Sequence, residues 1–206
     1  SWVVQEGASR VQVDLDAGML KTDKATVPLE EVEFELIEGD PADAVAAARA
    51  VAERLPARLG VLSKAERGAA LLGGRLGKAV KASPLQLGRE MTVAQAFAAI
   101  VHACLRHFRQ NEDLVLACQA ADALHQSRVA MRRLRSALTF FRPAIRDDPA
   151  FARLREELRW FTAELGDARD LDVYLQRDLP EAEREAALAR RGQAYARVLE
   201  AMNAAR

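Results

Sequence analysis

The chain has 206 residues, of which 50% are hydrophobic and 29% are charged, and 30 Lys and Arg balance 30 Asp and Glu. This composition is typical of a soluble globular protein and excludes intrinsic disorder and a collagen-like repeat. The longest uncharged stretches fall short of the roughly 20 apolar residues that a bilayer crossing requires, and the N-terminal residues lack a signal-peptide pattern. Cys104 and Cys118 lack metal-ligand spacing, so we expect free thiols and a cytoplasmic location.

Residues 1–38 alternate polar and apolar side chains, which is the period expected for antiparallel strands with one apolar face. The triplet Asp16-Ala17-Gly18 predicts a turn between two of these strands. Because Ser1 is followed at once by the strand-like Trp2-Val3-Val4, we also expect the sequence to be part of a longer chain.

Two helices are predicted after the strands. Asp40 as N-cap and Pro41 at the first helical position indicate the start of an alanine-rich helix that continues to about Leu55. The Ser-x-x-Glu spacing of Ser63 and Glu66 is that of a capping box, which predicts a short second helix.

Residues 73–90 are rich in glycine and in basic residues and show no clear period, so we interpret them as a linker. This linker would separate a first domain, residues 1–72, from a second domain, residues 91–206. Four helices are predicted in the second domain, at 92–109, from a break at 111–113 to 141, at 151–176, and from 180 to the chain end. Their short connections indicate an antiparallel four-helix bundle. The fold class is therefore α+β.

The first candidate site is a row of glutamates in the run E-V-E-F-E. On a strand, Glu31, Glu33 and Glu35 would point to one face while the apolar residues between them point to the other. Such a face can be an ordinary solvated surface. It can also hold a hard divalent cation such as Mg²⁺ or Mn²⁺, because the three carboxylates repel one another without one.

Three runs in this part of the chain resemble segments of one family. They are D-A-G-M-L-K at 16–21, E-V-E-F-E-L-I-E-G-D at 31–40 and L-G-V-L-S-K-A-E-R-G at 59–68. Together they resemble the C-terminal half of a CYTH domain, over about residues 2–72. The resemblance implies part of an eight-stranded tunnel barrel, in which inward basic residues hold a triphosphate chain and inward glutamates hold divalent metal.

By this resemblance, Glu31, Glu33 and Glu35 match the metal-binding strand, and Lys64 and Arg67 match the residues that hold phosphate oxygens. The implied cofactor is Mg²⁺ or Mn²⁺, and the implied activity is that of a metal-dependent inorganic triphosphatase. Cations would neutralise the phosphate oxygens while a positioned water attacks the terminal phosphoryl group. The family's N-terminal Glu-x-Glu-x-Lys strand does not occur in this sequence, so we expect hydrolysis only in a parent protein with a complete tunnel.

The second candidate site is a basic run from 125 to 146, which holds six arginines and no acid. Its side chains at 125, 128, 132 and 135 have the spacing of one helical face, and apolar residues occupy the opposing side. The stripe can be a solvated face, can pair with the acid-rich segment 164–185, or can await an anion. No acid within the run neutralises it at the neighbouring helical positions.

This run also resembles a known family. The pattern H-x-x-R-V-x-x-R-R-L-R-S-x-L-x-x-F-R-P at 125–143, followed by L-R-E-E-L-R-W-F-T-A-E-L-G-D-A-R-D-L-D-V at 154–173, is similar to the first half of a CHAD domain. The similarity extends over about residues 92–206 and implies the first of two four-helix bundles and binding of inorganic polyphosphate. The residues that match its phosphate-contacting motif are His125, Arg128, Arg132 and Arg135.

Further along the chain, we expect Arg155 and Arg159, one helical turn apart, to extend the basic surface. Arg169 and Asp170 are interpreted as forming structural ion pairs near the bundle core, and a phosphate contact through Arg169 is the alternative.

The two resemblances agree, because both families handle linear phosphate polymers. We therefore expect this chain to bind inorganic polyphosphate or triphosphate, with Mg²⁺-dependent triphosphatase activity in the intact parent and no membrane partner. One alternative is a non-enzymatic adaptor that places its partners on polyphosphate granules. Another is binding of nucleic-acid phosphates by the same arginines, although an aromatic content of 5% argues against a stacking platform for single strands.

Overall fold

The computed structural model describes residues 1–55, 57–145 and 149–204. Within these ranges the chain forms a three-stranded antiparallel sheet and seven helices, which confirms the expected α+β class. The chain divides into two compact units, the sheet unit Ser1–Leu76 and the helical unit Gly77–Arg206. Of the helices in the described ranges, none has the length and apolar character that a membrane crossing requires.

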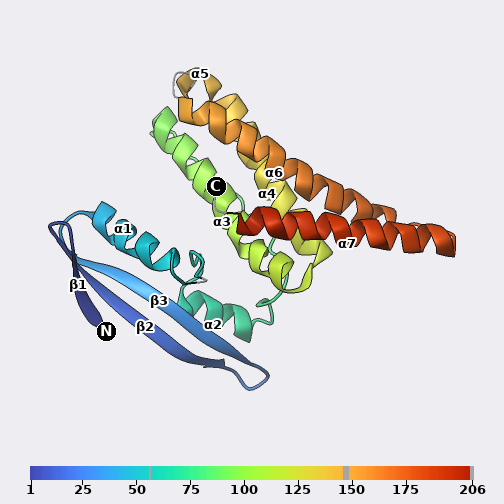
Figure 1. The fold of residues 1–206 in the computed structure, drawn as a ribbon. Helices are drawn as coiled ribbons and strands as arrows, with labels where there is room; N and C mark the ends of the chain where they lie inside the picture. The colour runs from blue at the N-terminus through green and yellow to red at the C-terminus, as the bar shows by residue number, and fades with distance from the viewer. Residues whose placement is uncertain (56, 146–148, 205–206) are drawn as a thin grey trace. The chain divides into compact units, whose positions relative to one another are not determined.

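The sheet unit begins with three strands in the order β1-β2-β3, which are Trp2–Glu6, Ser9–Lys21 and Thr26–Glu38 (Figure 1). The turn expected at residues 16–18 is wrong, because these residues pair across the ladder with residues 29–31 of β3. Gly18 is tolerated inside this ladder, although a glycine in a strand interior has no side chain to pack. The chain instead turns at residues 22–25, where the Thr22 amide donates to the Ala25 carbonyl at 2.8 Å.

Two helices complete the sheet unit, α1 (Pro41–Ala52) and α2 (Lys64–Leu72). Both starts follow the sequence signals. The Asp40 side chain accepts a hydrogen bond from the Ala42 amide, and Ser63 and Glu66 form a reciprocal capping box. Helix α1 ends three residues before the expected Leu55.

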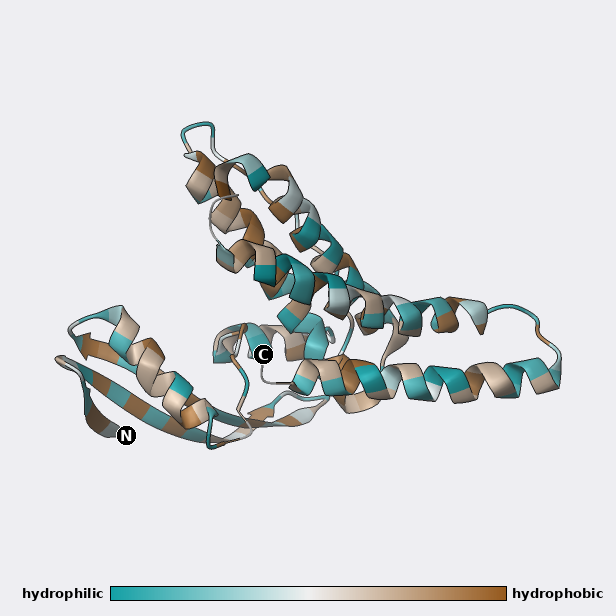
Figure 2. Cartoon of the chain, turned by 45° about the horizontal axis from the view of Figure 1, so that its top comes forward, coloured by the Kyte–Doolittle hydropathy of each residue, from teal (hydrophilic) through white to brown (hydrophobic). Residues whose placement is uncertain are grey.

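In its described residues, the helical unit contains four long helices and one short one (Figure 1). They are α3 (Val93–Cys118), α4 (Ala121–Phe140), α5 (Arg142–Ile145), α6 (Pro149–Tyr174) and α7 (Glu181–Asn203). Helix α4 packs against α3 and α6, and α6 packs against α7. The four long helices share one hydrophobic core, with Cys104, Leu124, Leu165 and Tyr195 among its fully buried members. Figure 2 shows both hydrophobic and hydrophilic residues along these helices, as one-sided burial requires.

The helix break expected at residues 111–113 is wrong, because these residues lie inside α3. Asn111 is fully buried, and its side chain bonds both backbone groups of Val80, accepting from the amide and donating to the carbonyl at 2.9 Å each. This residue, whose propensity favours a break, is kept in the helix by tertiary hydrogen bonds. The helix ends instead before Gln119, which adopts a left-handed conformation with φ 51°.

The Val80 bonds also attach part of the expected linker to the helices. Residues 77–90, which fall within the segment interpreted as a linker, group with the helical unit. The His107 side chain, 3% exposed, contacts the same Val80 carbonyl at 3.0 Å. This segment is therefore fixed on α3 by two buried polar side chains.

These contacts predict that Asn111→Ala lowers the free energy of unfolding of the helical unit by about 1 to 3 kcal/mol, because the Val80 amide loses its side-chain acceptor and the Val80 carbonyl keeps only His107. Chemical denaturation followed by circular dichroism measures this. The control is Asp113→Ala, an exposed site on the same helix, which should change stability by less than about 0.5 kcal/mol. Equal stabilities for the Asn111 variant and the control would show that the Asn111–Val80 hydrogen bonds do not stabilise the helical unit.

Candidate functional site

Two basic residues of α4, Arg128 and Arg135, lie where α4 packs against α6. Arg135 Nη1 donates a hydrogen bond to Thr162 Oγ1 of α6 at 2.9 Å. About two turns earlier on α4, Arg128 lies beside Gly166 of α6. Its Nε atom is 3.8 Å from the position that a Cβ atom on Gly166 would take. As residue numbers fall along α4 they rise along α6, so the two helices run antiparallel and Arg128 and Arg135 lie at their junction.

Helix α6 presents a matching row of residues along this junction. Five of its residues recur at alternating steps of four and three, which is the spacing of one helical face. They are Arg155, Arg159, Thr162, Gly166 and Arg169. We call the combined surface the α4–α6 basic face; it consists of His125, Arg128, Arg132 and Arg135 of α4 with Arg155, Arg159 and Arg169 of α6.

The arginines of this face have few acidic partners. Among the described residues, Arg159 pairs with Glu156 on its own helix at 2.5 Å, and no salt bridge is formed by the other five arginines of the face. The acids of the later segment pair elsewhere. Glu164 and Asp167 bind Arg197 of α7, and Asp172 binds Arg191. Most of the positive charge of the basic face is therefore not neutralised by ion pairs within the described structure.

His125 is a partly buried member of this face, and its Nδ1 atom is buried without a hydrogen-bond partner in the described structure. Burial lowers the pKa of His125, and the charges of Arg169, Arg128 and Arg132 lower it further, while Asp122 opposes them. The imidazole is thus held neutral at neutral pH. An anion placed among these arginines would raise the pKa and favour the charged ring.

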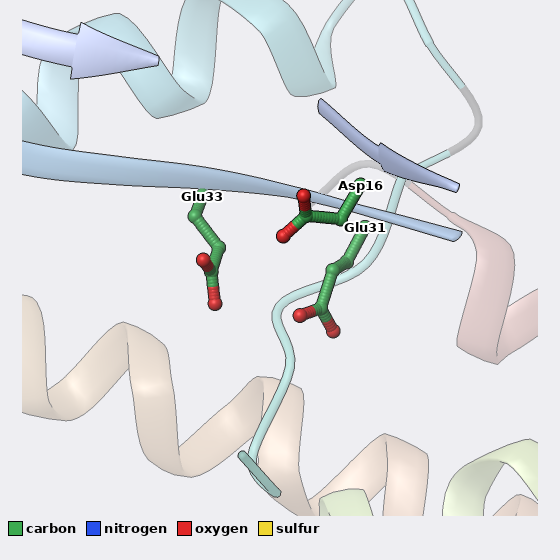
Figure 3. Close-up of side chains that lie close together, drawn as sticks. All are labelled: Asp16, Glu31 and Glu33. Carbon is green, nitrogen blue, oxygen red and sulfur yellow. The ribbon is translucent and has the colours of Figure 1, made fainter. Parts of the chain in front are cut away.

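The sheet unit gathers a second set of candidate residues on one side of its strands (Figure 3). Carboxylate oxygens of Asp16, Glu31 and Glu33 lie within 4.8 Å of one another. Asp16 belongs to β2 and is the direct cross-strand partner of Glu31, so the register adds a residue that was not among the sequence candidates. Glu35, which was among them, lies opposite Gln12 and is not part of this cluster.

Lys64 of α2 stands among these carboxylates. Its Nζ atom lies 2.8 Å from Glu33 Oε2 and 3.2 Å from Glu31 Oε1, and it also pairs with Asp16. Hydrogen bonds to Asp16 and Glu33 raise the pKa of Lys64. In this state Lys64 neutralises the acidic cluster, so a divalent cation bound there would have to displace its ammonium group.

Arg67 follows one turn later on α2. Its guanidinium lies 3.6 Å from Glu31 Oε2 and donates to the Pro28 carbonyl at 3.3 Å. The structure thus brings Lys64 and Arg67 together with the glutamates, as partners of those carboxylates. A phosphate group would reach the two cations only if these ion pairs opened.

Sequence reasoning missed two residues at the α4–α6 junction, Thr162 and Gly166. For Arg169 it favoured a structural ion pair over a phosphate contact, but in the described structure Arg169 forms no salt bridge and stands near His125. Thr162 and Gly166 carried no chemical signal of their own. Their spacing with Arg155, Arg159 and Arg169 was nevertheless visible in the sequence and would have found them.

Comparison with known proteins agrees with this geometry. The family model described as CHAD domain matches residues 99–206, slightly more than half of the chain, and the chain therefore belongs to the CHAD family. It is similar to a solved structure, the crystal structure of the CHAD domain from the plant Ricinus communis, with 35% sequence identity and a TM-score of 0.50. The match covers 59% of this chain but only 43% of that one. The family match leaves residues 1–98 outside it, and their resemblance to a CYTH domain stays a prediction.

Proposed function

We propose that this protein binds inorganic polyphosphate or triphosphate on the α4–α6 basic face. The observation that carries the proposal is the set of six arginines and a histidine on one face of two packed helices, with a single salt bridge among them in the described structure. Membership of the CHAD family is consistent with ligands of this general kind. Like charges held together in this way are stabilised by a bound polyanion.

The chemistry of the side chains favours phosphate oxygens. A guanidinium group is always charged and presents a planar set of donors that matches two oxygens of one phosphate group. Because the basic residues follow one another along α4 and α6, a linear polyanion can meet several of them at once. Affinity should therefore rise with the number of phosphate groups, as in any multivalent contact.

Isothermal titration with long-chain polyphosphate tests this proposal. The double variant Arg128→Ala with Arg132→Ala should bind at least about tenfold more weakly than wild type, because two charge-assisted contacts are lost. The matched control is Arg153→Ala with Arg190→Ala, which removes the same charge from exposed positions outside the face. The control should bind like wild type at 0.1 M salt, where exposed charges are screened beyond about 10 Å.

Two results would contradict the proposal. If both double variants lost the same affinity, the arginines would contribute only net charge. If duplex DNA bound wild type more tightly than polyphosphate, the same residues would serve contacts to nucleic-acid phosphates.

We further propose that the acidic cluster of the sheet unit binds Mg²⁺ or Mn²⁺ and serves triphosphate hydrolysis where a complete tunnel is present. The supporting observation is that carboxylates of Asp16, Glu31 and Glu33 converge from two strands. Hard carboxylate oxygens suit these cations. The metal would bring positive charge to phosphate oxygens, and Lys64, once released from the carboxylates, would supply another cation beside them.

Titration with Mg²⁺ alone separates this metal site from a permanent ion-pair cluster. Replacing Lys64 by Met removes the competing ammonium group, so Mg²⁺ affinity should increase by about tenfold, or ~1.4 kcal/mol. Adding Glu31→Gln to that variant should abolish the gain. Lys24→Met, which removes an exposed lysine from the turn between β2 and β3, is the charge-matched control and should leave the affinity unchanged. A Lys64 variant that binds Mg²⁺ no better than this control would refute the metal site.

A further inference from the structure

We propose that Thr162 is a positioning residue of the α4–α6 basic face, whose hydroxyl group holds the Arg135 guanidinium in place for a phosphate ligand. The inference rests on the proposed polyphosphate binding and adds a residue that carries no charge of its own. It starts from one contact across the junction, the 2.9 Å hydrogen bond from Arg135 Nη1 to Thr162 Oγ1.

The Thr162 hydroxyl is itself fixed in direction. The residue is 9% exposed, and Oγ1 lies 2.6 Å from the Leu158 carbonyl one turn earlier on α6. A hydroxyl group has one hydrogen and two lone pairs. Donation of that hydrogen to the Leu158 carbonyl leaves a lone pair aimed away from the α6 backbone, where Arg135 donates to it.

The partner of Arg135 is neutral, and this distinguishes the contact from the cross-helix ion pairs of Arg197 and Arg191. Arg197 and Arg191 bind carboxylates at 3.0 and 2.7 Å, so their charge is compensated within the protein. A hydroxyl oxygen fixes a guanidinium group without cancelling its charge. One of the five N–H donors of Arg135 is used, and four remain for a ligand.

Fixing this side chain favours binding for an entropic reason. Arg135 is exposed, and an exposed arginine samples many rotamers that a bound anion would have to restrict. An arginine held in advance over the helix junction loses less freedom on binding. The Thr162 hydroxyl therefore raises affinity without touching the ligand.

The experiment compares Thr162→Val with Thr162→Ser by calorimetric titration with long-chain polyphosphate. Valine keeps the shape and removes the hydroxyl group, and we expect it to weaken binding roughly threefold to tenfold. Serine keeps the hydroxyl group and should restore wild-type affinity. Thermal unfolding of each variant is followed in parallel, and Thr162→Ala provides a second variant without the hydroxyl group if valine perturbs the fold.

A double-mutant cycle with Arg135→Ala separates positioning from a general structural role. In the Arg135→Ala background, Thr162→Val should have no further effect on affinity, because the group that it positions is gone. An equal loss of affinity in both backgrounds would overturn the inference, as would wild-type affinity for Thr162→Val. If Arg135→Ala weakens binding and Thr162→Val does not, only this inference fails. Absence of polyphosphate binding by the wild-type protein would overturn the proposed function as well.

Discussion

Burial of the apolar side of α4 fixes the direction in which its basic side chains point. Leu124, Met131, Leu134 and Leu138 are at most 4% exposed and lie in the core shared by the four long helices. Rotating α4 to turn its arginines elsewhere would bring these side chains into water, at a cost of roughly 1.5–3 kcal/mol for each one fully exposed. The position of the basic face over α6 is therefore a consequence of core packing.

The two candidate sites handle like charges in opposite ways. In the sheet unit, the clustered carboxylates are compensated by Lys64 and Arg67. In the helical unit, α6 places a hydroxyl group against Arg135 and a bare glycine beside Arg128, at Thr162 and Gly166. Neither partner removes positive charge. The arginines of the helical unit therefore repel one another, and a bound polyanion would relieve this repulsion. The sheet unit already contains its own counter-ions.

Local signals were sufficient for part of this structure. The caps at Asp40 and Ser63 and the strands within residues 1–38 appear as expected, because each depends on neighbours in sequence. The wrong break at 111–113 and the missing Asp16 have a common cause. Asn111 is kept in α3 by Val80, and Asp16 joins the acidic cluster through its cross-strand partner, so both depend on tertiary contacts. The periods of α4 and of Arg155 and Arg159 indicated basic faces on both helices, but the contact of Arg135 with Thr162 could be known only from the helix packing.

The proposed binding mode places a phosphate polymer along the α4–α6 basic face. The most direct measurement is a titration of the wild-type protein with polyphosphate, followed by NMR through the arginine Nε–Hε signals. We expect the signals of Arg128, Arg132 and Arg169 to shift together and saturate, while those of Arg153 and Arg190 stay in place. Shifts confined to Arg153 and Arg190, or spread equally over all arginines, would contradict it.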